Sequence, residues 1–456
     1  MKKRLKFFTT LVLITLLLIG AWPAAAFAAS SGPDITGSAA YVYCATTEEV
    51  LWKKNASKQY NLASITKLMT CLLAAEKLDL AEEVTITQAA TEVIKTESFV
   101  YAGEKIKAED LVYAALLASA NDAAKALAIT VSGSEKKFVK LMNQKAKELG
   151  CKNTRFVTSS GVYNKNHYSS AEDIVKIARA AFANPDVLRI AKVAEYTVPA
   201  TNKTDTVTLK TTNLFLKGGE ADTGNGKIKI KKYKGMVAGK TGTTNVNRTT
   251  MVVLCKIDGF DIYAVILDST LQQRYRDIKK LLDYAKATLS PYKAFESGQS
   301  FEGAKLKGGA TNRVNALASA DGLINLPEGA SASLVTTQVS FDADLQAPIK
   351  KGQVIGKAAV YLADEKIREI DLTAAEDVKE GWFLSRFGIT NLQTVILFFA
   401  LAVILAFCIL ILVLRTINKR KRKAARQRRL MEAARRQMER EKDLKHGFEI
   451  TCTLSI

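Results

Sequence analysis

Residues 63–73 read Ala-Ser-Ile-Thr-Lys-Leu-Met-Thr-Cys-Leu-Leu and place a serine and a lysine three positions apart at the start of an apolar helix pattern. Residues i and i+3 of a helix share one face, so the Lys67 amine can lie over the Ser64 hydroxyl. A serine becomes a nucleophile when a base takes its proton, and a lysine is such a base when burial and nearby positive charge lower its pKa. The stretch therefore predicts a serine nucleophile held by a buried helix.

The serine–lysine spacing alone is weak evidence, because Ser134–Lys137 and Ser290–Lys293 share it. Ser134 precedes a charged helix pattern and Ser290 begins a proline turn. Both are expected to be solvated capping or turn residues rather than nucleophiles.

Two further motifs follow in the chain. Ser119-Ala120-Asn121 supplies a hydroxyl that can relay a proton and an amide that can orient a lysine and bind a substrate carbonyl. Lys240-Thr241-Gly242 follows a strand pattern, and Gly239 and Gly242 allow close backbone approach along a strand edge. Each motif alone is typical of a helix break or a turn, but the three in this order indicate one catalytic site.

The surrounding pattern predicts an α+β layered domain. Strands are expected in residues 39–53, 193–199, 205–210 and 227–238, helices in Ala63–Leu78, Ala108–Val131, Glu135–Gly150 and Tyr275–Ala287, and a hairpin in Thr249–Ile257 and Asp261–Asp268. From residue 294 to about 380, glycines punctuate short β-rich stretches such as 333–341 and 353–362. This change of character predicts a second, smaller all-β domain after a catalytic domain over residues 38–293.

The net charge of +21 is concentrated at the two ends of the chain. Four lysines and arginines precede the apolar stretch 7–20 and a small-residue cleavage signal at Ala26-Phe27-Ala28, so residues 1–28 are expected to be a secretory signal peptide. Residues 395–414 are an uncharged run of 20 residues, long enough to cross a membrane, and residues 415–456 carry 14 basic against 5 acidic residues. Positive residues stay on the cytoplasmic side, so residues 29–394 are expected outside and the basic tail inside.

Few residues in the exported part could bind a metal. Cys44, Cys71, Cys151 and Cys255 have no metal-ligand spacing and are expected to be buried free thiols, and His167 is the one histidine outside the tail. The sequence therefore predicts no metal and no cofactor. Export also separates the catalytic part from cytoplasmic nucleic acid, so we expect no nucleic-acid partner. We expect the basic tail to contact anionic lipid, and the alternative is that it is a solvated stop-transfer segment.

With the three motifs in order, the chain resembles the D-alanyl-D-alanine carboxypeptidases among the low-molecular-mass penicillin-binding proteins. Further matching elements are Gly161-Val162, His167–Asp173, Thr211–Phe215, Arg274–Asp277 and the region 294–378. The resemblance implies a β-lactamase/transpeptidase-like catalytic domain followed by a small all-β domain. It also implies removal of the terminal D-alanine from peptidoglycan stem peptides and covalent inhibition by β-lactam antibiotics.

The resemblance also implies roles for individual residues. Ser64 would be the acyl-forming nucleophile, Lys67 the general base, and Ser119 and Asn121 the proton relay and substrate binder. The expected substrate-binding residues are Lys240, Thr241, Gly242, Thr243 and Arg274, with the Ser64 and Thr243 amides as an oxyanion hole and Arg274 on the terminal carboxylate. Arg276 competes with Arg274 for that last role, and His167 is expected to be structural.

Three alternatives stand beside this interpretation. A β-lactamase would need a glutamate for deacylation, and residues 155–175 offer only Glu172. A D,D-endopeptidase acting on cross-linked peptidoglycan would use identical residues. A penicillin-binding sensor or scaffold would signal through the cytoplasmic tail, although the complete motif set argues against an idle site.

Overall fold

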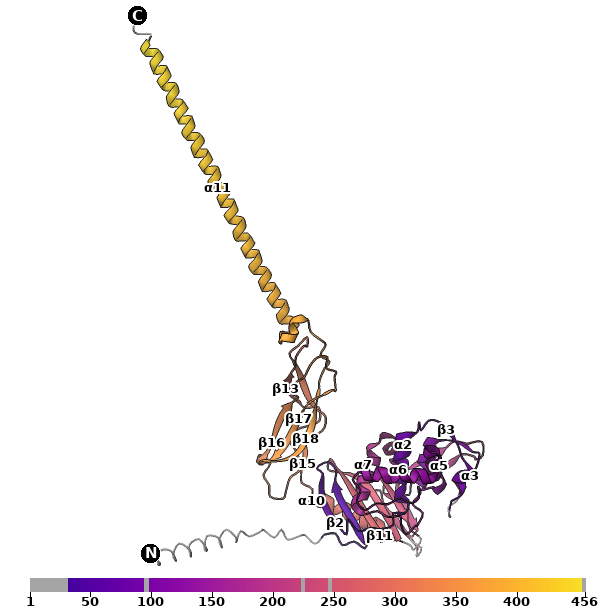
Figure 1. Cartoon of the computed structure of the whole chain (residues 1–456). Coiled ribbons are helices and arrows are strands. Elements are labelled where there is room, and N and C mark those ends of the chain that lie inside the picture. The colour runs from indigo at the N-terminus through magenta and orange to yellow at the C-terminus, as the bar shows by residue number, and fades with distance from the viewer. Residues whose placement is uncertain (1–31, 94–97, 223–225, 245–247, 453–456) are drawn as a thin grey trace, which may run out of the picture. The chain divides into compact units, whose positions relative to one another are not determined.

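The computed structural model describes residues 32–93, 98–222, 226–244 and 248–452, so the expected signal peptide lies outside the described residues. The chain divides into two compact units (Figure 1). One runs to Ala294 and includes Leu323–Thr336 and Tyr361–Arg368, and the other comprises Phe295–Gly322, Thr337–Val360 and the chain from Glu369 onward.

The first unit is built on a five-stranded antiparallel sheet in the order β2-β1-β11-β10-β9. Its strands are β1 (Ala39–Cys44), β2 (Glu49–Lys54), β9 (Met236–Thr243), β10 (Arg248–Ile257) and β11 (Phe260–Thr270). The predicted hairpin is confirmed as β10 and β11. Asp258 and Gly259 join the two strands with φ values of 48° and 90°, as a tight turn between twisted strands requires.

Both faces of this sheet are buried, because side chains alternate between two apolar clusters. Val252 and Leu254 of β10 belong to the cluster on the helical side, whereas Val253 and Cys255 belong to the cluster around α10 (Arg274–Thr288). On β9, Ala238 faces the helical side. By the same alternation, Lys240 two residues later also faces the helices.

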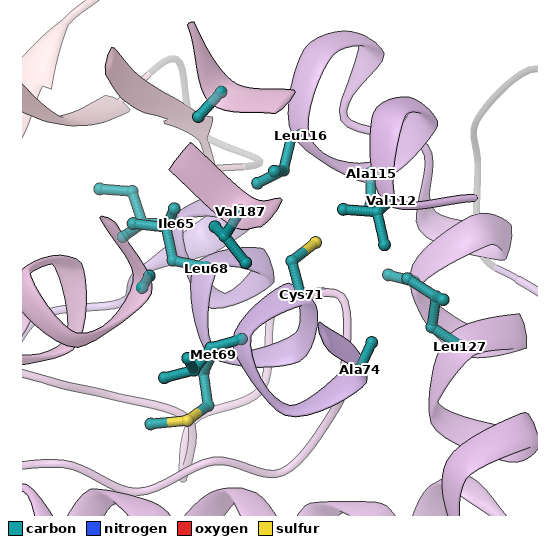
Figure 2. Close-up of a cluster of buried hydrophobic side chains, with 14 of the residues drawn as sticks. Ile65, Leu68, Met69, Cys71, Ala74, Val112, Ala115, Leu116, Leu127 and Val187 are labelled. Atoms are coloured by element: carbon teal, nitrogen blue, oxygen red, sulfur yellow. The ribbon is translucent and has the colours of Figure 1, made fainter. Parts of the chain in front are cut away.

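The helical side contains the elements that carry the first two motifs. They are η1 (Ala63–Thr66), α2 (Lys67–Lys77), α3 (Gln88–Thr91), α4 (Ala108–Tyr113), η2 (Ala114–Ala118), α5 (Asn121–Ser132), α6 (Glu135–Glu148), α7 (Ala171–Ala183) and α8 (Pro185–Ala191). Helix α2 lies in the middle of this block, with Leu68 and Cys71 surrounded by apolar side chains of neighbouring elements such as Val112, Leu127 and Val187 (Figure 2). The nucleophile candidate Ser64 therefore lies in η1, directly before a largely buried helix that begins at Lys67.

Short paired strands and one short helix fill the connections. They are β3 (Glu83–Thr85) with β4 (Lys105–Lys107), β5 (Glu195–Val198) with β6 (Val207–Lys210), β7 (Gly219–Asp222) with β8 (Lys227–Ile230), β12 (Pro291–Lys293) with β15 (Leu323–Asn325), and α9 (Leu214–Lys217).

Some expected elements were wrong in extent. The single helix expected over Ala108–Val131 is three pieces, α4, η2 and α5, because the chain leaves the helical conformation at Ser119. In place of the single strand expected over 227–238, the chain forms two successive strands, β8 and β9, with residues 231–235 between them. Helices α7 and α8 were not expected at all.

The second unit confirms the expected all-β character. Its sheet has the order β13-β14-β18-β17-β16, from β13 (Ser300–Lys305), β14 (Arg313–Ala318), β16 (Val335–Phe341), β17 (Val354–Leu362) and β18 (Glu365–Ala374), and the short turn η4 (Phe383–Phe387) follows it. The turn η3 (Ala332–Leu334), the start of β16, the end of β17 and the start of β18 are grouped with the first unit. The chain then continues as α11 (Asn391–Cys452), the long helix of Figure 1. A stretch of α11 has a mean hydropathy of 3.4 and is not buried in the protein, which suits a membrane anchor.

Candidate active site

The serine–lysine pair lies where η1 passes into α2. Ala63 has a φ of 46°, in the left-handed region, and its amide donates to Asn61 Oδ1 at 3.0 Å, which fixes the backbone just before Ser64. Lys67 is completely buried, and its Nζ donates to Ser64 Oγ at 2.9 Å. The predicted pairing of hydroxyl and amine is therefore present.

Lys67 has two further partners. Its Nζ donates to Asn121 Oδ1 at 2.8 Å and to the carbonyl oxygen of Ser160 at 2.9 Å. Burial holds the pKa of Lys67 well below its usual value, and the charge of Lys240 lowers it further. A neutral amine keeps two of these donor contacts and accepts the proton of Ser64, which is what a general base requires.

Ser119 is presented by an irregular helix end. The turn η2 is π-helical, and Ser119 follows it with a φ of 64° before α5 begins at Asn121. Single π-helical turns are often found at functional sites because they redirect the side chains that follow. Here the break brings Asn121 to Lys67 and lets Ser119 Oγ accept from Lys240 Nζ at 2.9 Å.

Lys240 is the second buried lysine of the site. It is 1% exposed, and burial lowers its pKa to about 7, with the charge of Arg274 acting in the same direction. Its amine also donates to the carbonyl oxygen of Thr241 at 3.0 Å. At neutral pH this amine therefore lies near the middle of its titration.

The two glycines of the third motif allow close packing along β9. A Cβ on Gly242 would lie 2.5 Å from Thr250 Oγ1 and 2.8 Å from the Leu62 carbonyl oxygen, and a Cβ on Gly239 would lie 2.8 Å from the Val252 carbonyl oxygen. Such distances exclude any larger residue without backbone movement. Because β9 is the last strand of the sheet order, its outer edge is free to pair with an extended ligand.

A cleft of about 720 Å³ brings the three motifs together. Among the predicted site residues, its lining includes Ser64, Ser119, Asn121, Thr241, Gly242, Thr243 and Arg274. Lys67 and Lys240 are not among the lining residues, and their amines reach the cleft through Ser64 and Ser119. No acidic side chain belongs to this lining in the described part of the chain.

The structure distinguishes the two neighbouring arginines. Arg274 lines the cleft and its guanidinium lies 4.9 Å from the ring centre of Tyr275, whereas Arg276 is exposed and does not line the cleft. The Nε of Arg274 is buried without a hydrogen-bond partner. This leaves Arg274 as the guanidinium available to an anionic group in the cleft.

His167 is buried and supports the site from outside the cleft. Its Nδ1 accepts from the Val157 amide at 3.1 Å, so its Nε2 carries the hydrogen and donates to Thr66 Oγ1 at 2.8 Å. Burial lowers the pKa of His167 to about 4. His167 thus joins η1 to the segment that contains Ser160.

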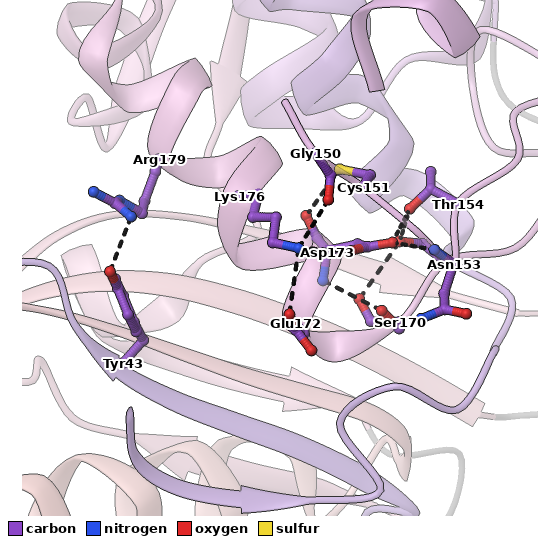
Figure 3. Close-up of polar contacts among 11 residues, drawn as sticks. Tyr43, Gly150, Cys151, Asn153, Thr154, Ser170, Glu172, Asp173, Lys176 and Arg179 are labelled. Atoms are coloured by element: carbon purple, nitrogen blue, oxygen red, sulfur yellow. Dashed lines mark hydrogen bonds and ion pairs between the residues drawn. The ribbon is translucent and has the colours of Figure 1, made fainter. Parts of the chain in front are cut away.

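The start of the same segment is held to α7 by hydrogen bonds of Asn153 and Thr154 with Asp173 (Figure 3). Asp173, near the start of α7, accepts from the Asn153 amide at 2.6 Å and from Thr154 Oγ1 at 2.9 Å, while Ser170 caps the helix. Glu172 instead pairs with Lys176 at 3.3 Å, on α7. It is not a cleft residue, which removes the glutamate that the β-lactamase alternative needs.

The two other serine–lysine spacings have ordinary structural surroundings. Ser134 caps α6 by accepting from the Lys137 amide at 3.3 Å. Ser290 is exposed and its amide donates to Asn325 Oδ1 at 2.9 Å. Neither belongs to the cleft lining.

Three features of the site had no role assigned from the sequence, although Gly161 and Thr212 lie in elements that match the family. The Ser160 carbonyl is a backbone group and has no side-chain signature, and the adjoining Gly161, with a φ of 84°, packs so closely that a Cβ would lie 1.9 Å from the Ala63 carbonyl oxygen. Thr212 lines the cleft and accepts from Thr241 Oγ1 at 2.8 Å. Tyr163, 58% exposed, lies at the rim.

Within the described residues, no group of histidines, cysteines and acids could hold a metal ion, and Cys44, Cys71, Cys151 and Cys255 are free thiols.

Comparisons with known proteins show which families the chain resembles. A family model described as D-alanyl-D-alanine carboxypeptidase matches residues 26–270, and one described as the C-terminal domain of penicillin-binding protein 5 matches residues 290–380. The carboxypeptidase DacF of Bacillus subtilis (strain 168) is 29% identical over 346 residues, which cover 74% of this chain and 85% of DacF. A D-alanyl-D-alanine endopeptidase of Escherichia coli (strain K12) is 29% identical over 287 residues, which cover 60% of this chain and 88% of that protein.

A solved structure is also similar. Penicillin-binding protein 5 from Haemophilus influenzae has 27% sequence identity and a TM-score of 0.55, covering 77% of this chain and 99% of the solved chain.

The buried His167 predicts sensitivity to acid. The pKa of His167 is about 4 in the folded protein against 6.5 for an ordinary histidine, so the unfolded state binds the proton first. Stability is therefore full above pH ~6.5 and falls by roughly 3 kcal/mol as the pH drops to about 4. Urea denaturation between these pH values measures this loss. His167→Gln should show a flatter pH dependence, and an equal slope in both proteins would contradict the assignment.

Proposed function

The chain belongs to the D-alanyl-D-alanine carboxypeptidase family, and from that premise we propose that it removes the terminal D-alanine of peptidoglycan stem peptides with Ser64 as nucleophile. It is a serine-type D-Ala-D-Ala carboxypeptidase. The observation that carries the assignment of Ser64, which lines the cleft, is its 2.9 Å hydrogen bond with the buried amine of Lys67.

The first half of the reaction forms an acyl-enzyme. Neutral Lys67 accepts the proton of Ser64 as Oγ attacks the carbonyl carbon between the two D-alanines. The backbone amides of Ser64 and Thr243 stabilise the oxyanion. The proton then passes through Ser119, which is bonded to Lys240, to the nitrogen of the leaving D-alanine. Lys67 is thereby neutral again.

The second half returns the enzyme. Water adds to the acyl carbon as Lys67 takes one of its protons. The Ser64–carbonyl bond then breaks to release the shortened peptide, and Lys67 returns the proton to Ser64 Oγ, with which it is hydrogen-bonded. Asn121 keeps the Lys67 amine in place and donates to the substrate carbonyl through its Nδ2. Thr241 and Gly242 on the free edge of β9 hold the substrate backbone, and Arg274 binds the carboxylate of the leaving D-alanine.

A β-lactam amide can enter the same acylation step, so covalent binding of β-lactams belongs to this proposal. A D,D-endopeptidase is the second candidate. It would use the same residues on the D-alanyl bond of a cross-link, and the similarity to the endopeptidase of Escherichia coli favours keeping it. No separate observation supports the sensor or scaffold alternative.

We further propose the domain and membrane arrangement predicted from the sequence. Residues 1–28 are a signal peptide, 38–293 the catalytic domain, 294–380 the C-terminal β domain, 395–414 a membrane span and 415–456 a cytoplasmic tail. The exposed apolar part of α11 supports the span. Arg415–Arg429 contains nine positive residues, and each gains about 1 kcal/mol near an anionic inner leaflet.

Product analysis distinguishes the two enzymatic candidates. We expect the full chain in detergent to release free D-alanine from an uncross-linked pentapeptide, at a rate that a metal chelator does not change. A cross-linked dimer should be cut much more slowly. Cleavage of the dimer alone would favour the endopeptidase, and chelator inhibition reversed by zinc would contradict the serine mechanism.

Penicillin labelling tests the nucleophile directly. Mass spectrometry should locate the adduct on Ser64, with Ser134 and Ser290 unmodified. Lys67→Ala should slow labelling by about 10² or more because the base is lost. Ser134→Ala is the matched control and should label normally, whereas an adduct on any other serine would refute the assignment.

The adjacent arginines provide a matched pair for the substrate carboxylate. Arg274→Gln should lower kcat/KM for a D-Ala-D-Ala peptide by roughly 10-fold to 100-fold, because a charged hydrogen bond is lost. Arg276→Gln should have little effect, because its side chain is outside the cleft. The difference should disappear for a substrate with an amidated C-terminus. Equal losses in both variants would show that Arg274 has no special role.

Cysteine labelling tests the topology. A membrane-impermeant maleimide should reach Cys452 only after intact cells are permeabilised, because the tail is proposed to be cytoplasmic. Cys452→Ser identifies the signal. Labelling of Cys452 in intact cells would invert the proposed orientation.

A further inference from the structure

Three large aromatic side chains are exposed immediately before α11. Trp382 is 55% exposed, and Phe383 and Phe387, at the two ends of η4, are 72% and 73% exposed. The rings of Phe383 and Phe387 are 6.0 Å apart. We call Trp382, Phe383 and Phe387 the aromatic turn. Clustered exposed apolar side chains usually mark a contact surface rather than ordinary protein surface.

The aromatic turn is fixed in place. The Gly381 amide donates to the Gly308 carbonyl oxygen at 2.8 Å, and the Gly308 amide donates to the Ser385 carbonyl oxygen at 3.2 Å. Ser385 is only 3% exposed. A Cβ on Gly381 would lie 2.4 Å from the Gly309 carbonyl oxygen, so the backbones are in close contact. The rings are therefore presented outward by a rigid turn and are not the loose end of a linker.

The turn is also attached to the start of α11. The Trp382 amide donates to Asn391 Oδ1 at 2.8 Å, and the Asn391 amide donates to the Ala310 carbonyl oxygen at 3.2 Å. Leu392, one residue further, is 70% exposed and begins the apolar part of the helix. The aromatic surface is thus continuous with the surface proposed to enter the membrane.

The polar surroundings of the turn contain both charge signs. A cavity of about 610 Å³ is lined by Trp382 and Phe383 together with Lys307, Glu380 and Arg386. A zwitterionic lipid headgroup presents a phosphate and an ammonium group, which suit the two basic residues and the glutamate. Tryptophan and tyrosine prefer the boundary between headgroups and hydrocarbon, because one ring has apolar and polar parts.

We propose that the aromatic turn lies in the lipid headgroup layer of the outer leaflet, with Trp382 at the boundary to the hydrocarbon. The inference rests on the proposed span of α11 but adds a second membrane contact, made by the β-domain side of the junction. The span alone requires nothing of residues 382–387. The added contact would fix the level of the junction at the bilayer surface.

Fluorescence quenching in liposomes tests this contact with the full chain. The sequence has three tryptophans, Trp22, Trp52 and Trp382, so Trp22→Phe with Trp52→Phe leaves Trp382 as the single emitter. Lipids brominated near the carbonyl end of the acyl chains should reduce its emission about twofold, as expected for a ring at the interface. Lipids brominated near the terminal methyl group should quench it less. The matched control, Trp22→Phe with Trp382→Phe, reports Trp52 and should show little quenching.

The outcomes separate this inference from the proposed span. If the chain sediments with the liposomes but Trp382 is quenched no more than Trp52, the span stands and the aromatic turn is not in the lipid. Stronger quenching by the deep bromines would also contradict the headgroup position. If the chain fails to sediment with liposomes, the span itself is wrong. Protection of Trp382 that depends on protein concentration would instead assign the turn to a second copy of the chain.

Discussion

The site depends on the burial of two lysine amines beneath one cleft. Burial removes both amines from water and lowers the pKa of Lys67 and of Lys240, and the charge of Lys240 lowers the pKa of Lys67 further. Two neighbouring buried ammonium groups are unfavourable, so one amine gives up its proton. This constraint turns an ordinary lysine into a base and leaves the other amine to polarise Ser119. The sheet and the helices can both be understood as supports for this pair.

The two lysines belong to different layers of the fold, and each contacts one serine of the cleft lining. Lys67 starts α2, whose apolar residues fix it from the helical side, and Lys240 belongs to the edge strand β9. The strict alternation of β9 turns Lys240 toward the helices. Ser119 and Asn121 lie at the irregular junction between η2 and α5, where one hydroxyl contacts Lys240 and one amide contacts Lys67. The segment anchored by His167 adds the Ser160 carbonyl oxygen.

The sequence was informative where spacing and alternation determine geometry. The i, i+3 rule placed Lys67 over Ser64, and alternating apolar residues with Asp258-Gly259 gave the β10–β11 hairpin. Conformations imposed by tertiary contacts were not predictable in the same way, such as the π-helical turn before Ser119. The contact of Lys67 with the Ser160 carbonyl oxygen was also not predictable, because a backbone group can be supplied by any residue type.

Helices α7 and α8 illustrate a recognisable signal that was missed. Ser170 with Asp173 resembles a capping box, and Asn184 before Pro185 is a typical helix start. Which of Arg274 and Arg276 faces the cleft also follows from a simple rule, because residues two apart on a helix point in different directions. Once α10 is known to begin at Arg274, only one of the two arginines can face the cleft.

The mechanism depends most on the pKa of Lys67, which burial and the charge of Lys240 hold well below its usual value. The direct test is an NMR titration of ¹³C-labelled lysine side chains, with Lys67 assigned by substitution. We expect a Lys67 pKa well below the ordinary value of 10.5. Lys240→Gln should raise that pKa by removing a nearby positive charge, while Lys256→Gln, at an exposed site, should leave it unchanged. A Lys67 that stays protonated up to its ordinary pKa, or a pKa indifferent to Lys240→Gln, would contradict the account.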